Sequence, residues 1–152
     1  MLVYRIAKRQ YASDISGKGA ALYPGRWNKY GTPVLYTGIN IEIALLETIV
    51  HLPQMLAPKL DLLTIQIPKD SILSLNSHEL PSKWHQFPAP AILQEIGQEW
   101  IDEGKYLALK VPSCIVQSSY ICILNCRHAQ FDEVKVINHQ PFELDARLSN
   151  KI

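Results

Sequence analysis

Two charged side chains of this sequence stand where they could act on a ligand. Arg26 lies in the segment Gly25-Arg26-Trp27-Asn28. The glycine lets the backbone approach a ligand closely, and the guanidinium is a planar donor fork suited to phosphate or carboxylate. Glu47 lies in the largely apolar segment Ile41–Leu52, where a carboxylate is costly unless it is paired or faces a wet cleft. The alternatives are a structural turn around a buried tryptophan for Arg26 and a solvent-exposed helical strip for Glu47.

Two hydroxyl side chains are weaker candidates, because each follows an apolar run. Tyr36 stands near the end of Pro33-Val-Leu-Tyr-Thr-Gly38, and it could equally be a core residue whose hydroxyl finds a partner at the rim. Ser113 follows Pro112, a place where serine is usually a turn residue. No G-x-S-x-G pattern surrounds Ser113, so the sequence gives no indication of a hydrolase-type nucleophile.

The remaining signals for cofactor chemistry are negative. Cys122, Cys126 and His128 lack a CxxC pair and a fourth ligand, so no metal site is predicted. Cys114 is the third cysteine, and an odd number in apolar surroundings favours reduced, buried thiols in a cytoplasm. Neither a GxGxxG loop nor a Walker-type loop occurs, which excludes the usual nucleotide-binding motifs.

Composition predicts one globular domain over residues 1–152. The chain is 47% hydrophobic and 19% charged, and its formal net charge is +1. With so small a net charge, the protein as a whole is not attracted electrostatically to nucleic acid or to an anionic membrane. The N-terminus does not resemble a secretory signal, and the apolar runs are far shorter than the roughly 20 residues of a membrane span. We therefore expect a soluble, cytoplasmic protein.

The elements that must position these residues are more strands than helices. Apolar, β-branched runs predict strands at Leu2–Ile6, Val34–Tyr36, Leu60–Ile67, Tyr106–Val111, Tyr120–Leu124 and Val134–Ile137. A helix is predicted over Ile41–Leu52 with Asn40 as its N-cap, and another over Ala89–Glu103, closed by Gly104. Because the helices do not alternate with the strands, the pattern favours a mixed α+β domain.

The candidate residues also stand in an order that resembles a known family, the RES domain, which is named after an Arg, a Glu and a Ser. The resemblance rests on Tyr4-Arg5-Ile6, Gly17–Gly19, Gly25–Asn28, Gly31–Tyr36, Ala44–Glu47, His51, Val111–Ser113, Leu124–Phe131 and Phe142–Leu148. It implies a fold similar to ADP-ribosyltransferases, with a split, mostly antiparallel β core flanked by helices. It also implies a toxin of a bacterial type II toxin–antitoxin module that degrades NAD+.

The resemblance assigns roles to individual residues, with NAD+ as substrate and neither a cofactor nor a metal. Arg26 and Arg5 would bind the diphosphate, with Trp27 beside them. Glu47 would hold the ribose hydroxyls and offset the positive charge of an oxocarbenium-like centre, and Tyr36 would stack on nicotinamide. Ser113 would hydrogen-bond the substrate or orient Glu47.

Several alternatives stay open. The acceptor of the ADP-ribosyl group could be water, phosphate or a protein, the last making the chain a mono-ADP-ribosyltransferase. A non-catalytic partner-binding module and a ribonuclease are rivals from other classes, although the charge pattern speaks against nucleic acid. The expected protein partner is an Xre-type helix-turn-helix antitoxin, and the assembly could be a homodimer or a toxin–antitoxin hetero-oligomer. The stretch Pro68–Pro90, with Trp84 and Phe87, could contribute to an interface or a lid.

Overall fold

A single seven-stranded sheet organises the chain in the computed structural model, which describes residues 1–53 and 58–149. The strands are β1 (Leu2–Lys8), β2 (Val34–Gly38), β3 (Leu60–Gln66), β4 (Ile72–Ser74), β5 (Ala108–Pro112), β6 (Tyr120–Asn125) and β7 (Lys135–Phe142). Their order is β4-β5-β6-β2-β1-β3-β7. Between described residues, only β4 and β5 pair in parallel, and every other neighbouring pair is antiparallel.

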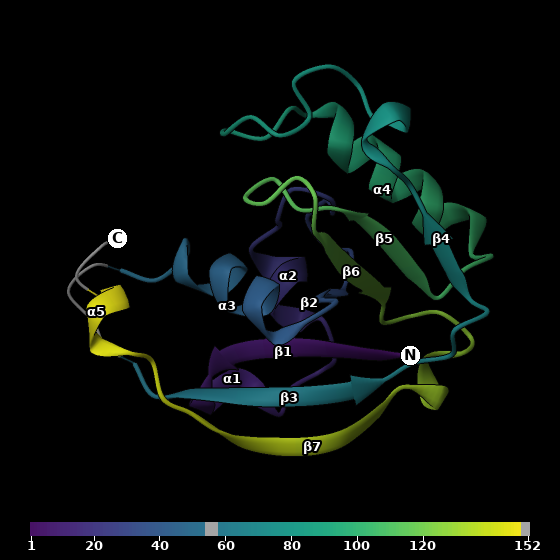
Figure 1. Ribbon diagram of the computed structural model, residues 1–152. Coiled ribbons are helices and arrows are strands. Elements are labelled where there is room, and N and C mark those ends of the chain that lie inside the picture. Colours follow the sequence, from purple (N-terminus) through teal and green to yellow (C-terminus); the bar gives the residue numbers. More distant parts are fainter. Residues whose placement is uncertain (54–57, 150–152) are drawn as a thin grey trace.

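The sheet is nearly divided between β1 and β2. These strands share one registered pair, Tyr4 with Gly38, whereas β1 pairs with β3 along all seven of its residues. The result is two halves, β4-β5-β6-β2 and β1-β3-β7, which diverge in Figure 1. The predicted α+β class with a split, mostly antiparallel core is therefore confirmed.

Five helices accompany the sheet in the described ranges 1–53 and 58–149: α1 (Arg9–Ala12), α2 (Lys18–Leu22), α3 (Ile41–Ile49), α4 (Ile92–Glu103) and α5 (Ala146–Ser149). Two short 3₁₀ turns, η1 (Ser77–Glu79) and η2 (Phe131–Glu133), complete the set. As predicted, Asn40 caps α3, because its Oδ1 accepts a hydrogen bond of 2.8 Å from the Ile43 amide. Gly104 ends α4 in the left-handed conformation, at φ 62°.

Both long helices are shorter than predicted, for the same reason. The residue before a proline is disfavoured in the helical conformation. Ala89 precedes Pro90, so α4 begins at Ile92, and Leu52 precedes Pro53, so α3 ends at Ile49. The short strand β4 lies in the stretch 68–90, where no strand was predicted. Its pairing with β5 is a tertiary contact that no local pattern indicates.

The two faces of the sheet bury different clusters. Helices α3 and α4 cover one face, where Ala44 packs with Ile6 and Leu62, and Leu93 packs with Leu109 and Ile123. The opposite face holds a third cluster with Val3, Leu63 and Ala12 of α1. Over the described part of the chain, no helix is long and apolar enough to cross a membrane.

Candidate active site

A buried serine holds the carboxylate of Glu47. Ser113 directly follows β5 and has none of its surface exposed. Its Oγ donates to Glu47 Oε1 over 2.8 Å, and it accepts from the amides of Ile115 at 3.0 Å and Val116 at 3.2 Å. The hydroxyl hydrogen and both lone pairs are thus engaged. This arrangement suits a group that positions Glu47 better than it suits a nucleophile.

Glu47 itself keeps one oxygen free for a ligand. It lies on α3 and is half-buried. Within residues 1–53 and 58–149, Oε2 has no hydrogen-bond partner, and no cation forms an ion pair with the carboxylate. A carboxylate that is fixed through one oxygen and open at the other can meet a hydroxyl or a developing positive charge.

The loop that carries Arg26 is fixed to Tyr36 by short hydrogen bonds. The amide of Trp27 donates to Tyr36 Oη at 3.0 Å, and Tyr36 Oη donates to Asn28 Oδ1 at 2.7 Å. The same Asn28 oxygen accepts from the Gly25 amide at 2.8 Å. A Cβ at position 25 would lie 2.8 Å from Tyr36 Oη, so the loop can approach the phenol this closely only with a glycine there. Asn28 is 2% exposed, and its function in fixing the loop was not predicted.

Main-chain oxygens hold the guanidinium of Arg26 on one side, and the Cys114 side chain also lies within its reach. Its Nη1 donates to the carbonyl oxygens of Trp84 at 2.9 Å and Gln86 at 2.8 Å. Among the described residues, Nε and Nη2 make no hydrogen bond that meets ordinary distance and angle limits. These two nitrogens form the edge of an arginine that binds phosphate or carboxylate in a bidentate manner.

Electrostatics places these residues in one neighbourhood. Burial raises the pKa of the Tyr36 phenol, with the charge of Arg26 lowering it and that of Glu47 raising it. Burial also raises the pKa of the Cys114 thiol, which the charge of Arg26 lowers and that of Glu47 raises. The structure therefore brings Arg26, Tyr36, Glu47 and Ser113 together. Sequence reasoning missed Cys114 as a member of the site, although its place beside Ser113 was a signal.

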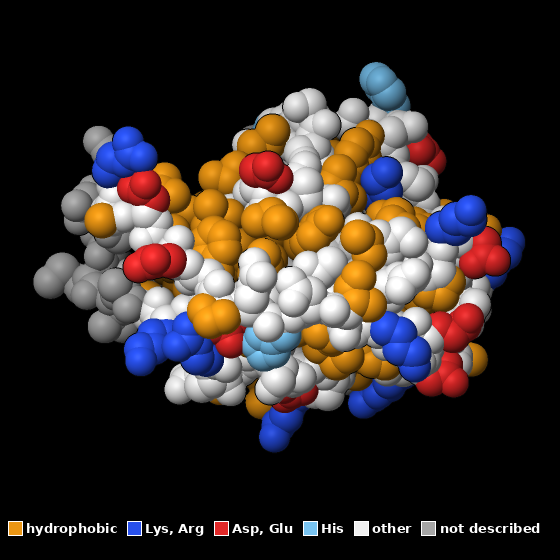
Figure 2. All heavy atoms as spheres, turned by 60° about the horizontal axis from the view of Figure 1, so that its bottom comes forward, with side chains coloured by type: hydrophobic (Ala, Val, Ile, Leu, Met, Phe, Trp, Pro, Cys, Tyr) orange, Lys and Arg blue, Asp and Glu red, His pale blue; other side chains and the backbone are white. Residues whose placement is uncertain are grey.

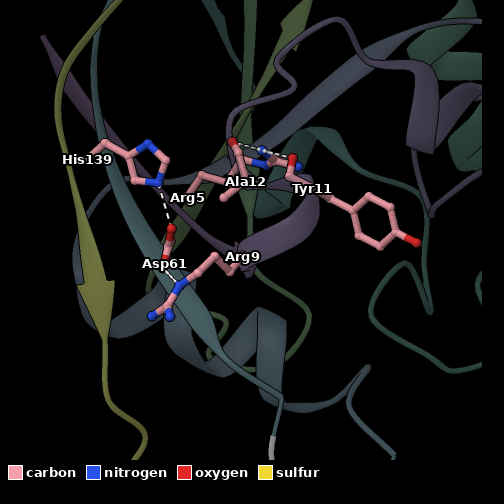
Figure 3. A network of polar contacts seen from close by, with 6 residues as sticks. All are labelled: Arg5, Arg9, Tyr11, Ala12, Asp61 and His139. Carbon is pink, nitrogen blue, oxygen red and sulfur yellow. Dashed lines mark hydrogen bonds and ion pairs between the residues drawn. The ribbon is translucent and has the colours of Figure 1, made fainter.

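Arg5 does not join this group. Side chains of a strand alternate between the faces, and on β1 Tyr4 and Ile6 pack towards α3, so Arg5 points to the opposite face. Its Nη1 donates to the Ala12 carbonyl oxygen at 2.7 Å, at the end of α1 (Figure 3). Burial lowers the pKa of this guanidinium. Arg5 thus ties α1 to β1, and the diphosphate contact expected for it does not follow from this arrangement.

Trp27 is also directed away from a ligand. Its indole is 1% exposed and packs in the core cluster with Leu93 and Trp84. The place beside the substrate expected for Trp27 therefore does not follow from this conformation, in which the ring is buried. Its contribution is to anchor the loop of Arg26, through an amide that donates to Tyr36. Across the described residues, no group of three or more His, Cys, Asp or Glu side chains could hold a metal ion.

Comparison with known proteins defines the class. The model of the RES domain matches residues 2–145, and the chain therefore belongs to the RES domain family. It is 36% identical to the protein named Toxin Res of Yersinia enterocolitica, over 97% of this chain and 99% of that protein. At this identity and coverage, the chain is a toxin of the RES family.

A second relative and a solved structure are also similar to the chain. The chain is 30% identical to the Prs ADP-ribosylating toxin of a Sphingobium species, over 95% of this chain and 92% of that protein. The fold is similar to the crystal structure of the M. tuberculosis MbcT–MbcA toxin–antitoxin complex, with a TM-score of 0.79 and 16% identity. That match covers 93% of this chain and 84% of the other. It supports the fold assignment alone.

Proposed function

We propose that this RES-family toxin uses NAD+ as its substrate and breaks the bond between nicotinamide and ribose. The observation that carries the proposal is the 2.8 Å hydrogen bond from buried Ser113 to Glu47. It fixes a carboxylate with a free oxygen in the same neighbourhood as the open edge of Arg26. A fixed anion and a cationic fork together match a substrate that has a diphosphate and develops positive charge on a sugar.

Glu47 would act on the ribose. When the C–N bond breaks, its electron pair leaves with the nicotinamide nitrogen, and the positive charge moves to the sugar as an oxocarbenium-like centre. The fixed carboxylate offsets this charge, which grows in the transition state. Nicotinamide departs as a neutral molecule because it is cationic when bound to ribose, so no general acid is required. A single carboxylate is therefore enough.

Arg26 and Tyr36 would hold the rest of the substrate. The Nε and Nη2 edge of Arg26 would take diphosphate oxygens in a bidentate contact. The Tyr36 ring would stack on nicotinamide, while its hydroxyl remains bonded to Asn28. Because burial raises the pKa of this phenol, the hydroxyl stays protonated at neutral pH and keeps its position as a donor.

The acceptor distinguishes the main proposal from one alternative. Water would give ADP-ribose and a proton, and phosphate would give the 1″-phosphate of ADP-ribose. Transfer to one of these two acceptors is the main proposal. The ADP-ribosylating relative supports the alternative of transfer to a protein side chain. Chromatography of products from NAD+, with and without phosphate and with bacterial extract, distinguishes the three outcomes.

An antitoxin partner is the second part of the proposal. The structural neighbour was solved as a toxin–antitoxin complex, and the resemblance described above points to an Xre-type helix-turn-helix protein. The exposed hydrophobic side chains include Leu46 and Val50 around Glu47, and Ile115 and Val116 beside Ser113. Apolar surface of this kind beside a site is suited to a protein partner. The face of the molecule drawn in Figure 2 also gathers hydrophobic side chains, with charged ones mostly around them.

The activity test compares wild type with Glu47→Ala. Purified wild-type protein should release nicotinamide from NAD+, and Glu47→Ala should lose that activity while its thermal unfolding remains cooperative. Expression of wild type alone should stop bacterial growth, and Glu47→Ala should be tolerated. The proposal is contradicted if wild type consumes NAD+ with none of the three acceptors.

A further inference from the structure

The hydrogen bonds between Arg26 and the segment Pro81–Pro88 all go to main-chain oxygens among the described residues. The two carbonyl groups of Trp84 and Gln86 receive hydrogen bonds of 2.9 and 2.8 Å from the same nitrogen, Nη1. An Nη nitrogen carries two hydrogens, so these bonds use both of them. The edge made by Nε and Nη2 matches two oxygens of a diphosphate, and the Cys114 side chain is the other group within reach of the guanidinium.

The backbone of Arg26 is held independently of that segment. Its neighbour Gly25 donates to Asn28 Oδ1 and accepts from Gln94 Nε2 at 3.1 Å, while the Trp27 amide donates to Tyr36. On the other side, a Cβ at Gly97 would collide with the Trp27 carbonyl oxygen, so α4 supports the loop directly. With the backbone fixed, the two carbonyl groups determine the direction of the long side chain.

We propose that Pro81–Pro88 is a positioning clamp, whose Trp84 and Gln86 carbonyls hold Arg26 with its Nε and Nη2 edge open to the diphosphate of the substrate. The proposal rests on the proposed NAD+ activity. The carbonyl groups are neutral dipoles, so they orient the guanidinium without the offsetting negative charge that a carboxylate partner would bring. Holding a flexible side chain in its binding geometry before the substrate arrives reduces the entropy lost on binding.

Lys83 gives access to the clamp without touching the site. The clamp is built from two turns, in which the Trp84 amide donates to the Pro81 carbonyl at 3.2 Å and the Gln86 amide donates to the Lys83 carbonyl at 3.1 Å. Between them Lys83 has φ 65°, a left-handed conformation that is strained for β-branched residues and free for glycine. The Lys83 side chain is exposed, and it makes no hydrogen bond or ion pair in the described chain. Replacing it therefore changes backbone preference with little loss of contact.

The test compares Lys83→Gly with Lys83→Val, which lose the same charge. Lys83→Gly should keep the KM for NAD+, whereas Lys83→Val should raise it roughly five- to thirtyfold and change kcat much less. Affinity for inorganic pyrophosphate, measured by calorimetry, should fall by the same factor. Lys83→Asn, which tolerates the left-handed conformation, should resemble glycine. Thermal unfolding of each variant shows that the fold is intact, and Lys83→Thr replaces valine where that variant fails to fold.

A double-mutant cycle connects the effect to Arg26. In an Arg26→Lys background, one Nζ cannot serve both the carbonyl pair and a diphosphate fork, so the glycine–valine difference should disappear. Equal KM values for folded Lys83→Gly and Lys83→Val, with wild-type NAD+ turnover present, overturn the clamp and leave the proposed function standing. A lower KM in Lys83→Val also overturns it, because the segment would then compete with the substrate. A pyrophosphate deficit in Lys83→Val, without NAD+ turnover in wild type, supports the clamp and refutes the proposed function.

Discussion

Replacing Ser113 with alanine removes one hydroxyl that makes three hydrogen bonds, and only one of them reaches the carboxylate of Glu47. A hydrogen bond to a charged group contributes about 1.5–3 kcal/mol. If this bond holds Glu47 where the transition state needs it, its loss lowers kcat about 10- to 150-fold, since 1.36 kcal/mol corresponds to a factor of ten. The expected variant is therefore slow and not inactive. The assay is nicotinamide release from NAD+ at saturating substrate.

The matched control for Ser113→Ala is Ser118→Ala on the same turn. Ser118 is exposed, and its side chain makes no hydrogen bond in the described part of the chain, so its replacement should leave kcat within about twofold. Denaturant unfolding separates loss of activity from loss of fold. Wild-type activity in Ser113→Ala refutes the positioning role. A loss as complete as that of Glu47→Ala, in a folded protein, assigns the serine a direct chemical role and also refutes it.

Two predictions concern the frame around the site. Gly97→Ala should destabilise the protein by about 2–3 kcal/mol, because the added Cβ collides with the Trp27 carbonyl oxygen. Gly19 is also helical, but a Cβ there meets nothing within 4 Å, so Gly19→Ala should stabilise the protein by about 0.5–1 kcal/mol. Equal urea midpoints for the two variants would contradict this prediction. The Arg9 guanidinium holds the pKa of Asp61 below its ordinary value. A depressed pKa adds stability above the unfolded value of about 4 that is lost as pH falls through the folded pKa. The wild-type urea midpoint should therefore drop more than that of Asp61→Asn between about pH 5 and pH 3, and parallel drops would contradict the assignment.

Local rules account for much of the fold. Asn40 and Gly104 were predictable as helix ends because capping depends on residues a few positions apart. The extra turn predicted at Ala89 was wrong, because Pro90 disfavours a helical residue before it. Strand β4 was not predictable, since its three residues depend on pairing with β5, more than 30 positions along the chain. Tertiary pairing of this kind leaves no periodic signal in so short a segment.

Sequence reasoning named four of the residues that lie together and less of the geometry that joins them. Arg26 and Glu47 stood out as charges in glycine-rich and apolar surroundings. Arg5 was grouped with them by sequence order, yet the alternation of β1 directs it to the other face. The contacts of Arg26 with main-chain oxygens of Trp84 and Gln86 could not be predicted, because a carbonyl group is present at every position and carries no residue type.

NAD+ cleavage with Glu47 as the acting carboxylate is tested most directly by nicotinamide release from purified wild type and Glu47→Ala, measured side by side with both proteins shown to be folded. This role of Glu47 predicts release by wild type and none above background by Glu47→Ala. No release by wild type in the presence of water, phosphate and bacterial extract would contradict it, as would equal release by the two proteins.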